Sequence, residues 1–175
     1  SVHNHFGIEP EKGVTDLVLG AAEFREVVFN PSIARLTVLP GRDRLSHSSE
    51  FLSTPKMHKF VEEIRDRYPK RIVVFDMPPV LGGADVLSFL PVVQACLLVL
   101  DLSDPLSLDE LEAVQALLAE RRIHLSPHWP GEDSAPPPED DDPFALRLPT
   151  LLLASKADLL PALDQELAVL RELSG

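Results

Sequence analysis

Four short apolar runs recur along the chain, and in each of them hydrophobic residues follow one another without alternating polar positions. They cover Leu36–Leu39, Ile72–Phe75, Ala95–Leu100 and Thr150–Ala154. Continuous apolar runs of this length are typical of parallel strands covered on both faces, because neither side of such a strand meets water. We therefore expect these four runs to form buried parallel strands.

Segments with helical periodicity lie between and beside these runs. We expect helices over residues 48–68, from Ser107 onward, over 161–173 and, more weakly, over 14–28. Ser107 with Glu110 has the spacing of a capping box, and Pro161 suits a first helical turn. Strands that alternate with helices predict βαβ crossovers. The expected fold is therefore α/β: a three-layer domain over residues 1–175 with an open, mostly parallel sheet of about four or five strands and flanking helices.

Residues 124–149 interrupt this alternation. Seven of the chain's 17 prolines lie there, and the segment contains the acidic, proline-rich run Pro136–Asp142. Such a composition buries too little apolar area to offset the entropy cost of ordering the chain. We expect a flexible loop, and the alternative is a polyproline or acidic docking motif.

The charge of the chain excludes some partners. It has 28 acidic against 16 basic residues and a formal net charge of −12, which repels nucleic acid and anionic lipid. No apolar run approaches the roughly 18 residues that span a bilayer. The single cysteine, Cys96, excludes an internal disulfide and suits a reducing compartment. We expect a cytoplasmic protein that binds no nucleic acid and does not insert into the membrane.

The strongest local signal for chemistry is an apolar run that ends in an acid, Ile72–Phe75 followed by Asp76. The carboxyl edge of a parallel sheet is where open α/β folds bind ligands. In P-loop NTPases an acid at this place orients water on the Mg²⁺ that bridges the nucleotide's phosphates. The alternative is that Asp76 only caps the segment that follows.

The first hundred residues resemble the bacterial tyrosine autokinases of polysaccharide biosynthesis, which are relatives of the ParA/MinD ATPases. The resemblance rests on Val2–Gly7, Gly13–Gly20, Leu36–Gly41, Ser49–Met57 and Asp76–Val80, followed by Asp85, in the family's order. It implies a P-loop fold that binds Mg²⁺ with ATP. The family's Walker B aspartate, a catalytic and metal-binding residue, falls on Asp76. The resemblance also implies a membrane-protein partner or self-association.

The sequence lacks the loop that would hold the phosphates. It contains no G-x-x-x-x-G-K-[ST] motif, so no glycine-rich turn and lysine are present to neutralise them. The family's tyrosine-rich tail has no counterpart in this sequence, whose one tyrosine, Tyr68, lies in an expected helix. In the family the P-loop precedes the position of Ser1, and the chain opens without Met. We therefore expect a fragment or a chimera that is inactive alone.

The second part of the chain, residues 95–175, resembles an Obg-type or related translation-factor-class GTPase. The resemblance rests on Leu97–Pro105 and Leu148–Leu160, which contains Ser155-Lys156-Ala157-Asp158. This tetrapeptide is similar to the [NT]-K-x-D guanine motif, so the resemblance implies that Ser155, Lys156 and Asp158 bind a nucleotide. The alternative is an exposed strand-to-helix turn with Asp158 near the helix start.

Three hypotheses for function follow. The first is a piece of a P-loop protein related to polysaccharide tyrosine autokinases, inactive as an ATPase or kinase without the Walker A loop. The second is a guanine-nucleotide binder. The third is a non-catalytic scaffold or interaction domain. The two resemblances meet near residues 95–100, which predicts a mosaic joined at a shared strand and leaves Mg²⁺ with either ATP or GTP as the expected cofactor.

Overall fold

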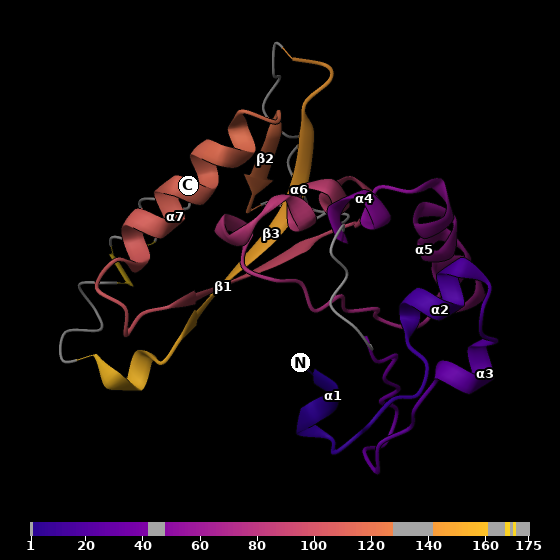
Figure 1. Ribbon diagram of the computed structural model, residues 1–175. Coiled ribbons are helices and arrows are strands. Elements are labelled where there is room, and N and C mark those ends of the chain that lie inside the picture. Colours follow the sequence, from indigo (N-terminus) through magenta and orange to yellow (C-terminus); the bar gives the residue numbers. More distant parts are fainter. Residues whose placement is uncertain (1, 42–47, 128–141, 161–166, 169, 171–175) are drawn as a thin grey trace. The chain divides into compact units, whose positions relative to one another are not determined.

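The computed structural model describes residues 2–41, 48–127, 142–160, 167, 168 and 170 (Figure 1). Contacts divide the chain into two compact units. The first comprises residues 1–78 and 84–92, and the second comprises residues 79–83 and 93–175. The prediction of a single domain stays a prediction, and each unit is described by itself.

The first unit is helical in the residues that the structure describes. Its helices are α1 (Val2–His5), α2 (Val14–Leu19), α3 (Phe24–Val27), α4 (Ser48–Leu52), α5 (Pro55–Arg67), α6 (Ala84–Phe89) and the 3₁₀ turn η2 (Leu90–Val92). The helix expected over 14–28 is two helices, because α2 ends at Gly20 in the left-handed region with φ 79°. Glycine reaches that conformation at no steric cost and stops the helix.

The helix expected over residues 48–68 is also broken, into α4 and α5. Thr54 is the N-cap of α5, and its Oγ1 accepts a hydrogen bond from the Met57 N–H at 3.2 Å. Pro55 follows at the first helical position, where its missing N–H costs no helical hydrogen bond. A continuous helix would have needed that N–H, so the chain starts a new helix here.

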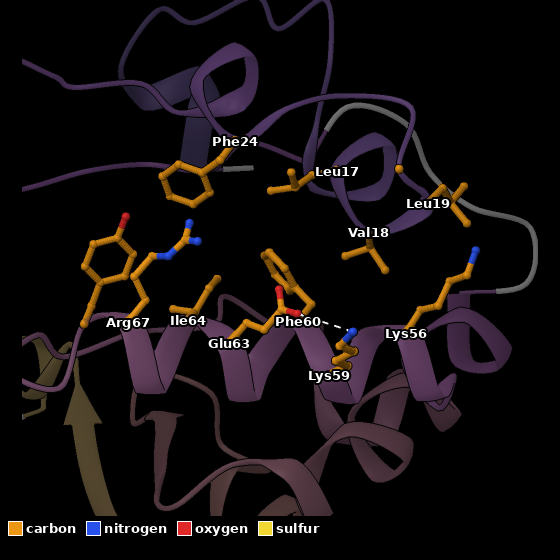
Figure 2. Close-up of a pocket in the computed structure, with 12 residues that line it drawn as sticks. Leu17, Val18, Leu19, Phe24, Lys56, Lys59, Phe60, Glu63, Ile64 and Arg67 are labelled. Carbon is orange, nitrogen blue, oxygen red and sulfur yellow. Dashed lines mark ion pairs between the residues drawn. The ribbon is translucent and has the colours of Figure 1, made fainter.

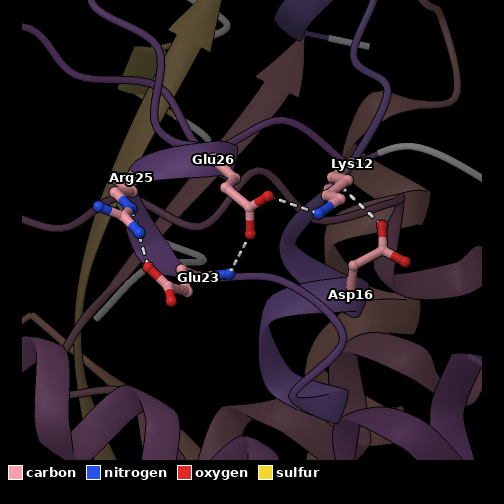
Figure 3. Close-up of polar contacts among 6 residues, drawn as sticks. Lys12, Asp16, Glu23, Arg25 and Glu26 are labelled. Atoms are coloured by element: carbon pink, nitrogen blue, oxygen red, sulfur yellow. Dashed lines mark hydrogen bonds and ion pairs between the residues drawn. The ribbon is translucent and has the colours of Figure 1, made fainter.

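A polar network joins the start of α2 to α3 (Figure 3). Lys12 Nζ lies 2.6 Å from Glu26 Oε1, and the other oxygen of Glu26 accepts the Glu23 N–H at 2.7 Å. These bonds lower the pKa of Glu26, the hydrogen bond from the Glu23 backbone most of all and then the one from Lys12. Asp16 in turn accepts the Gly13 N–H at 2.8 Å. Both short helices therefore have their first backbone donors satisfied by their own acids.

The apolar core of the first unit lies around α5 and α6. Met57 on α5 and Phe89 on α6 are buried, and the Phe89 ring contacts Phe75 edge-to-face with ring centroids 4.9 Å apart. Ser48 at the start of α4 donates a hydrogen bond to Asp85 Oδ2 at 2.6 Å, which ties α4 to α6. Asp85 is thus held by a side chain from a distant part of the sequence.

The second unit contains a parallel sheet. Its elements are η1 (Val80–Gly82), β1 (Cys96–Asp101), α7 (Ser107–Ala119), β2 (Ile123–Ser126), β3 (Leu146–Ser155) and η3 (Ala157–Leu159). The strand order is β1-β3-β2, with both pairs parallel. The α/β fold class is confirmed, and β1 and β3 confirm two of the four expected strands. The strand count is corrected from four or five to three among the described residues.

The other two expected strands are absent from the described residues. Leu36–Leu39 contributes only an isolated antiparallel bridge, Phe29 with Val38. Residues 72–79 have no regular secondary structure, so the strand predicted over Ile72–Phe75 is wrong in this structure. An isolated apolar run has no partner for its backbone N–H and C=O groups, and no described strand pairs with this one.

Strand β2 was not expected, because it lies at the start of the predicted loop 124–149. Together β2 and the first residues of β3 occupy both ends of that segment, and residues 128–141 lie outside the described part of the chain. His124 and Ser126 break the apolar pattern of β2. Pairing with β3 compensates for this weak pattern. The helix predicted over 161–173 lies mostly outside the described residues.

The two faces of the sheet differ. Leu98, Leu100, Leu152 and Ala154 pack in a cluster with Leu102 and Leu111, together with the described residues Leu167 and Leu170. The opposite side chains are Leu97, Val99, Leu151 and Leu153, which are 53%, 55%, 54% and 46% exposed. They are register partners, Leu97 beside Leu151 and Val99 beside Leu153. One face of the sheet is therefore core and the other is an exposed apolar surface.

Candidate functional site

The carboxyl ends of β1 and β3 lie side by side. Asp101 and Ser155 are the last residues of these strands and are register partners in the parallel pair. Parallel strands bring their carboxyl ends to one edge, and the connecting loops at that edge form the ligand sites of open α/β folds. We take Asp101, Ser155, Lys156 and Asp158 as the candidate site.

Asp101 is the most connected residue of this edge. Its Oδ2 lies 2.5 Å from the Lys156 ammonium, and its Oδ1 accepts the Ser103 N–H at 3.0 Å and the Ser103 hydroxyl at 2.7 Å. These contacts lower the pKa of Asp101 to about 2, the hydrogen bond from Lys156 most of all and then the hydroxyl of Ser103. Asp101 therefore carries a stable negative charge, of which Lys156 is the counter-ion.

The side chains of Ser155 and Lys156 both bind the end of the neighbouring strand, β1. The Ser155 hydroxyl donates to the Leu100 carbonyl at 3.0 Å, and the Ser155 carbonyl accepts the Leu102 N–H at 3.1 Å. Lys156 has φ 57°, in the left-handed region, and it turns the chain from β3 into η3. Both side chains therefore bind β1, across the strand pair.

Asp158 lies in η3 and is exposed. Its carboxylate makes no hydrogen bond or ion pair with another residue in the described part of the chain. The structure thus brings Ser155, Lys156 and Asp101 together and leaves Asp158 beside them. The guanine-binding role of Ser155, Lys156 and Asp158 stays a prediction.

Asp101 was missed as a site residue by sequence reasoning. The available signal was the same one that singled out Asp76, an apolar strand that ends in an acid. In the structure Asp101 ends strand β1, whereas Asp76 lies in a segment without regular secondary structure.

Asp76 lies in the irregular segment 72–78 of the first unit and is exposed. Upstream of it Ile72 is 94% exposed and Val74 is 78% exposed, so this run forms no buried strand. Asp101 and the residues after β3 belong to the second unit. The expected position of Asp76 at the end of a buried strand is therefore corrected, and its role as a metal ligand stays a prediction.

The expected cofactor, Mg²⁺ with ATP or GTP, stays a prediction. Mg²⁺ in nucleotide sites is held by one or two carboxylates together with the phosphates. No group of three or more His, Cys, Asp or Glu that could hold a metal gathers in the described ranges. Asp76 could supply one carboxylate, but the sequence has no phosphate-binding loop beside it.

None of the helices in the described part of the chain is long and apolar enough to cross a bilayer. The cytoplasmic location stays a prediction.

Comparison with known proteins gives matches to bacterial tyrosine kinases. The chain is 31% identical over 90 residues to a putative tyrosine-protein kinase EpsB of Ralstonia solanacearum. It is 25% identical over 84 residues to the tyrosine-protein kinase ptk of Acinetobacter johnsonii. Each match covers 48% of this chain and 11% of the relative. No protein-family model matches the chain.

The crystal structure of the VpsO kinase domain is similar to this one with a TM-score of 0.65 and 22% identity. The match covers 88% of this chain and 64% of that domain. At this identity the likeness shows the fold. The predicted resemblance to bacterial tyrosine kinases is thus supported, whereas the resemblance of residues 95–175 to a GTPase has no support from these matches.

Proposed function

We propose that this chain is part of a P-loop-type domain related to the tyrosine kinases of polysaccharide biosynthesis, and that by itself it neither binds ATP tightly nor transfers phosphate. The observation that carries the proposal is the fold similarity to a kinase domain over 88% of the chain, in a sequence without the G-x-x-x-x-G-K-[ST] loop. The fold indicates the relationship, and the missing loop removes the main source of phosphate affinity.

The charges at the carboxyl edge of the sheet support the proposal that the chain does not bind ATP tightly. Asp101 ends β1, Asp104 follows it and Asp158 lies in η3 after β3, and Lys156 is a cation paired with Asp101. This edge is therefore net negative. A triphosphate carries several negative charges, so without a cradle of backbone N–H groups the edge repels it.

The exposed apolar surfaces fit a fold that continues beyond what this chain supplies. On one face of the sheet, Leu97, Val99, Leu151 and Leu153 are about half exposed in the described part of the second unit. Parallel sheets of α/β folds are covered on both faces. The chain covers 64% of the VpsO kinase domain, and it spans about a tenth of the length of the curated relatives that it matches. We propose that further kinase-like structure covers this face.

A guanine-nucleotide site is the weaker alternative. The contacts of the described residues favour a structural role, because the Ser155 hydroxyl binds Leu100 and the Lys156 ammonium binds Asp101. Titration with labelled GDP and ADP separates the two readings. A preference for GDP that Asp158→Ala removes would support the alternative, and equal indifference to both nucleotides would support the proposal.

The proposal is tested by thermal unfolding of the full chain with and without Mg²⁺ and millimolar ATP, together with an ATP-hydrolysis and tyrosine-phosphorylation assay. A ligand at a hundred times its dissociation constant stabilises a protein by about 2.7 kcal/mol. We expect no change in the unfolding temperature and no turnover above buffer. A clear rise in that temperature with ATP, or phosphorylated Tyr68, would contradict the proposal.

A further inference from the structure

A pocket lies between α2 and α5 in the first unit, away from the sheet edge described above. Its volume is about 390 Å³. Leu17 and Val18 of α2 and Phe60 and Ile64 of α5 give it apolar walls (Figure 2). Phe24 and Tyr68 also line it, with ring centroids 6.2 Å apart. The pocket is thus an apolar and aromatic hollow on the surface of a helix pair.

Cations flank this apolar hollow. Figure 2 shows Lys56 and Arg67 at opposite ends of the α5 side of the pocket. Arg67 comes eleven positions after Lys56, which corresponds to about 16 Å along a helix. Between them Lys59 pairs with Glu63 at 3.7 Å. The side chains of Lys56 and Arg67 make no hydrogen bond or ion pair with any residue in the described ranges.

This arrangement selects an extended ligand with an apolar centre and a carboxylate at each end. The chain itself contains such a sequence at residues 132–141. Glu132 and Asp133 precede Ser134–Pro138, and Glu139–Asp141 follow. A polyproline helix rises about 3.1 Å per residue, so six steps correspond to about 19 Å, which is similar to the about 16 Å between Lys56 and Arg67 along α5.

We propose that this pocket binds the acidic, proline-rich segment 132–141 of a second copy of the chain. Proline-rich segments bind aromatic-lined grooves because little conformational entropy is lost on binding. The acids at both ends meet Lys56 and Arg67, two cations that pair with no residue in the described part of a chain of net charge −12. Binding therefore joins a positive patch to a negative segment and weakens as salt screens both.

The first experiment measures the fluorescence anisotropy of a labelled synthetic peptide of residues 131–143, titrated with the full chain. A receptor with Gln or Asn in place of all five acids of the segment, Glu132, Asp133, Glu139, Asp140 and Asp141, removes competition from the chain's own segment. We expect saturable binding that Lys56→Glu with Arg67→Glu weakens at least about tenfold. The matched control, Lys70→Glu with Arg121→Glu, makes the same charge change at exposed residues outside the pocket and leaves binding unchanged.

A peptide with Gln and Asn in place of its acids tests the same claim without altering the protein, and it should also bind at least about tenfold more weakly. Absence of saturable binding below about 1 mM peptide would overturn the proposal. Equal losses in the pocket variant and the control variant would overturn it too, because they would show only a general effect of net charge.

Sedimentation velocity of the full chain tests whether the segment bound in the pocket comes from a second copy. We expect self-association that the Lys56→Glu, Arg67→Glu variant lacks. Mixing that variant with a chain carrying Lys in place of the acids at both ends of the segment, Glu132, Asp133, Glu139, Asp140 and Asp141, should restore association, because the charges are then exchanged between the partners. A chain that stays monomeric at concentrations where the peptide binds would contradict association through this segment.

Discussion

Lys156 and Asp101 join the ends of two parallel strands: the ammonium of Lys156, just after β3, lies 2.5 Å from the carboxylate that ends β1. The same aspartate accepts two hydrogen bonds from Ser103. At the edge where α/β folds bind ligands, these two charges therefore satisfy each other. Because of this pairing, we infer that the carboxyl edge of the sheet has a structural role in this chain.

Acid should weaken the chain through Asp101. The pKa of this carboxylate is lowered to about 2 in the folded state, below its ordinary value of 3.8. A lowered folded pKa adds stability above the unfolded pKa, and that stability is lost as pH falls through the folded pKa. The difference in unfolding free energy between the unsubstituted chain and Asp101→Asn should therefore be constant above about pH 5 and shrink between about pH 4 and pH 2.

Urea unfolding at a series of pH values measures this difference. Glu112→Gln on α7 is a matched control, because its exposed side chain pairs with no residue in the described part of the chain. A difference for Asp101→Asn that does not change down to pH 2 would show that Lys156 and Ser103 do not hold this carboxylate.

Removing the cap of α5 should destabilise the first unit. Thr54 Oγ1 accepts the Met57 N–H, so Thr54→Ala leaves a first-turn donor without its partner. Loss of such a cap costs about 1 kcal/mol. Ser53→Ala is the control, since the exposed Ser53 hydroxyl donates to the Glu50 carbonyl and is not the cap of α5; it should change stability by less than about 0.5 kcal/mol. Equal values for the two variants in urea unfolding would refute the assigned helix start.

Two leucines of β3 test the difference between the faces of the sheet. Leu148 is 1% exposed and Leu151 is 54% exposed. Leu148→Ala should cost about 2–5 kcal/mol, because it removes a packed side chain and leaves a cavity. Leu151→Ala should cost less than about 1 kcal/mol. A larger loss at Leu151 would mean that this face is covered in solution.

The parts of the fold that could be predicted from sequence are those in which local pattern and pairing agree. Cys96–Asp101 and Leu146–Ser155 are apolar runs, and each finds a parallel partner in the other. Ile72–Phe75 has the same pattern but no described strand beside it, and there the prediction fails. A strand forms by pairing with a neighbouring strand, so the apolar pattern of one segment alone cannot establish that the segment is a strand.

The local sequence pattern also failed to predict where some helices begin. The capping box predicted at Ser107 is absent: Leu106 is the N-cap, and Ser107 is a buried first-turn residue. At α5 the Thr54-Pro55 start signal was present in the sequence, but the longer apolar periodicity across residues 48–68 masked it. Among site residues, Lys156 was singled out for a nucleotide, whereas its partner Asp101 becomes apparent only from the register of β1 and β3.

The direct test of the account is a titration of the full chain with fluorescent ATP and Mg²⁺, repeated with Asp76→Ala. Asp76 is exposed on an irregular segment, and the sequence has no phosphate loop. We predict no saturation below about 1 mM nucleotide and identical curves for both proteins. Micromolar ATP binding that Asp76→Ala abolishes would contradict the account, because it would show a working nucleotide site in this chain.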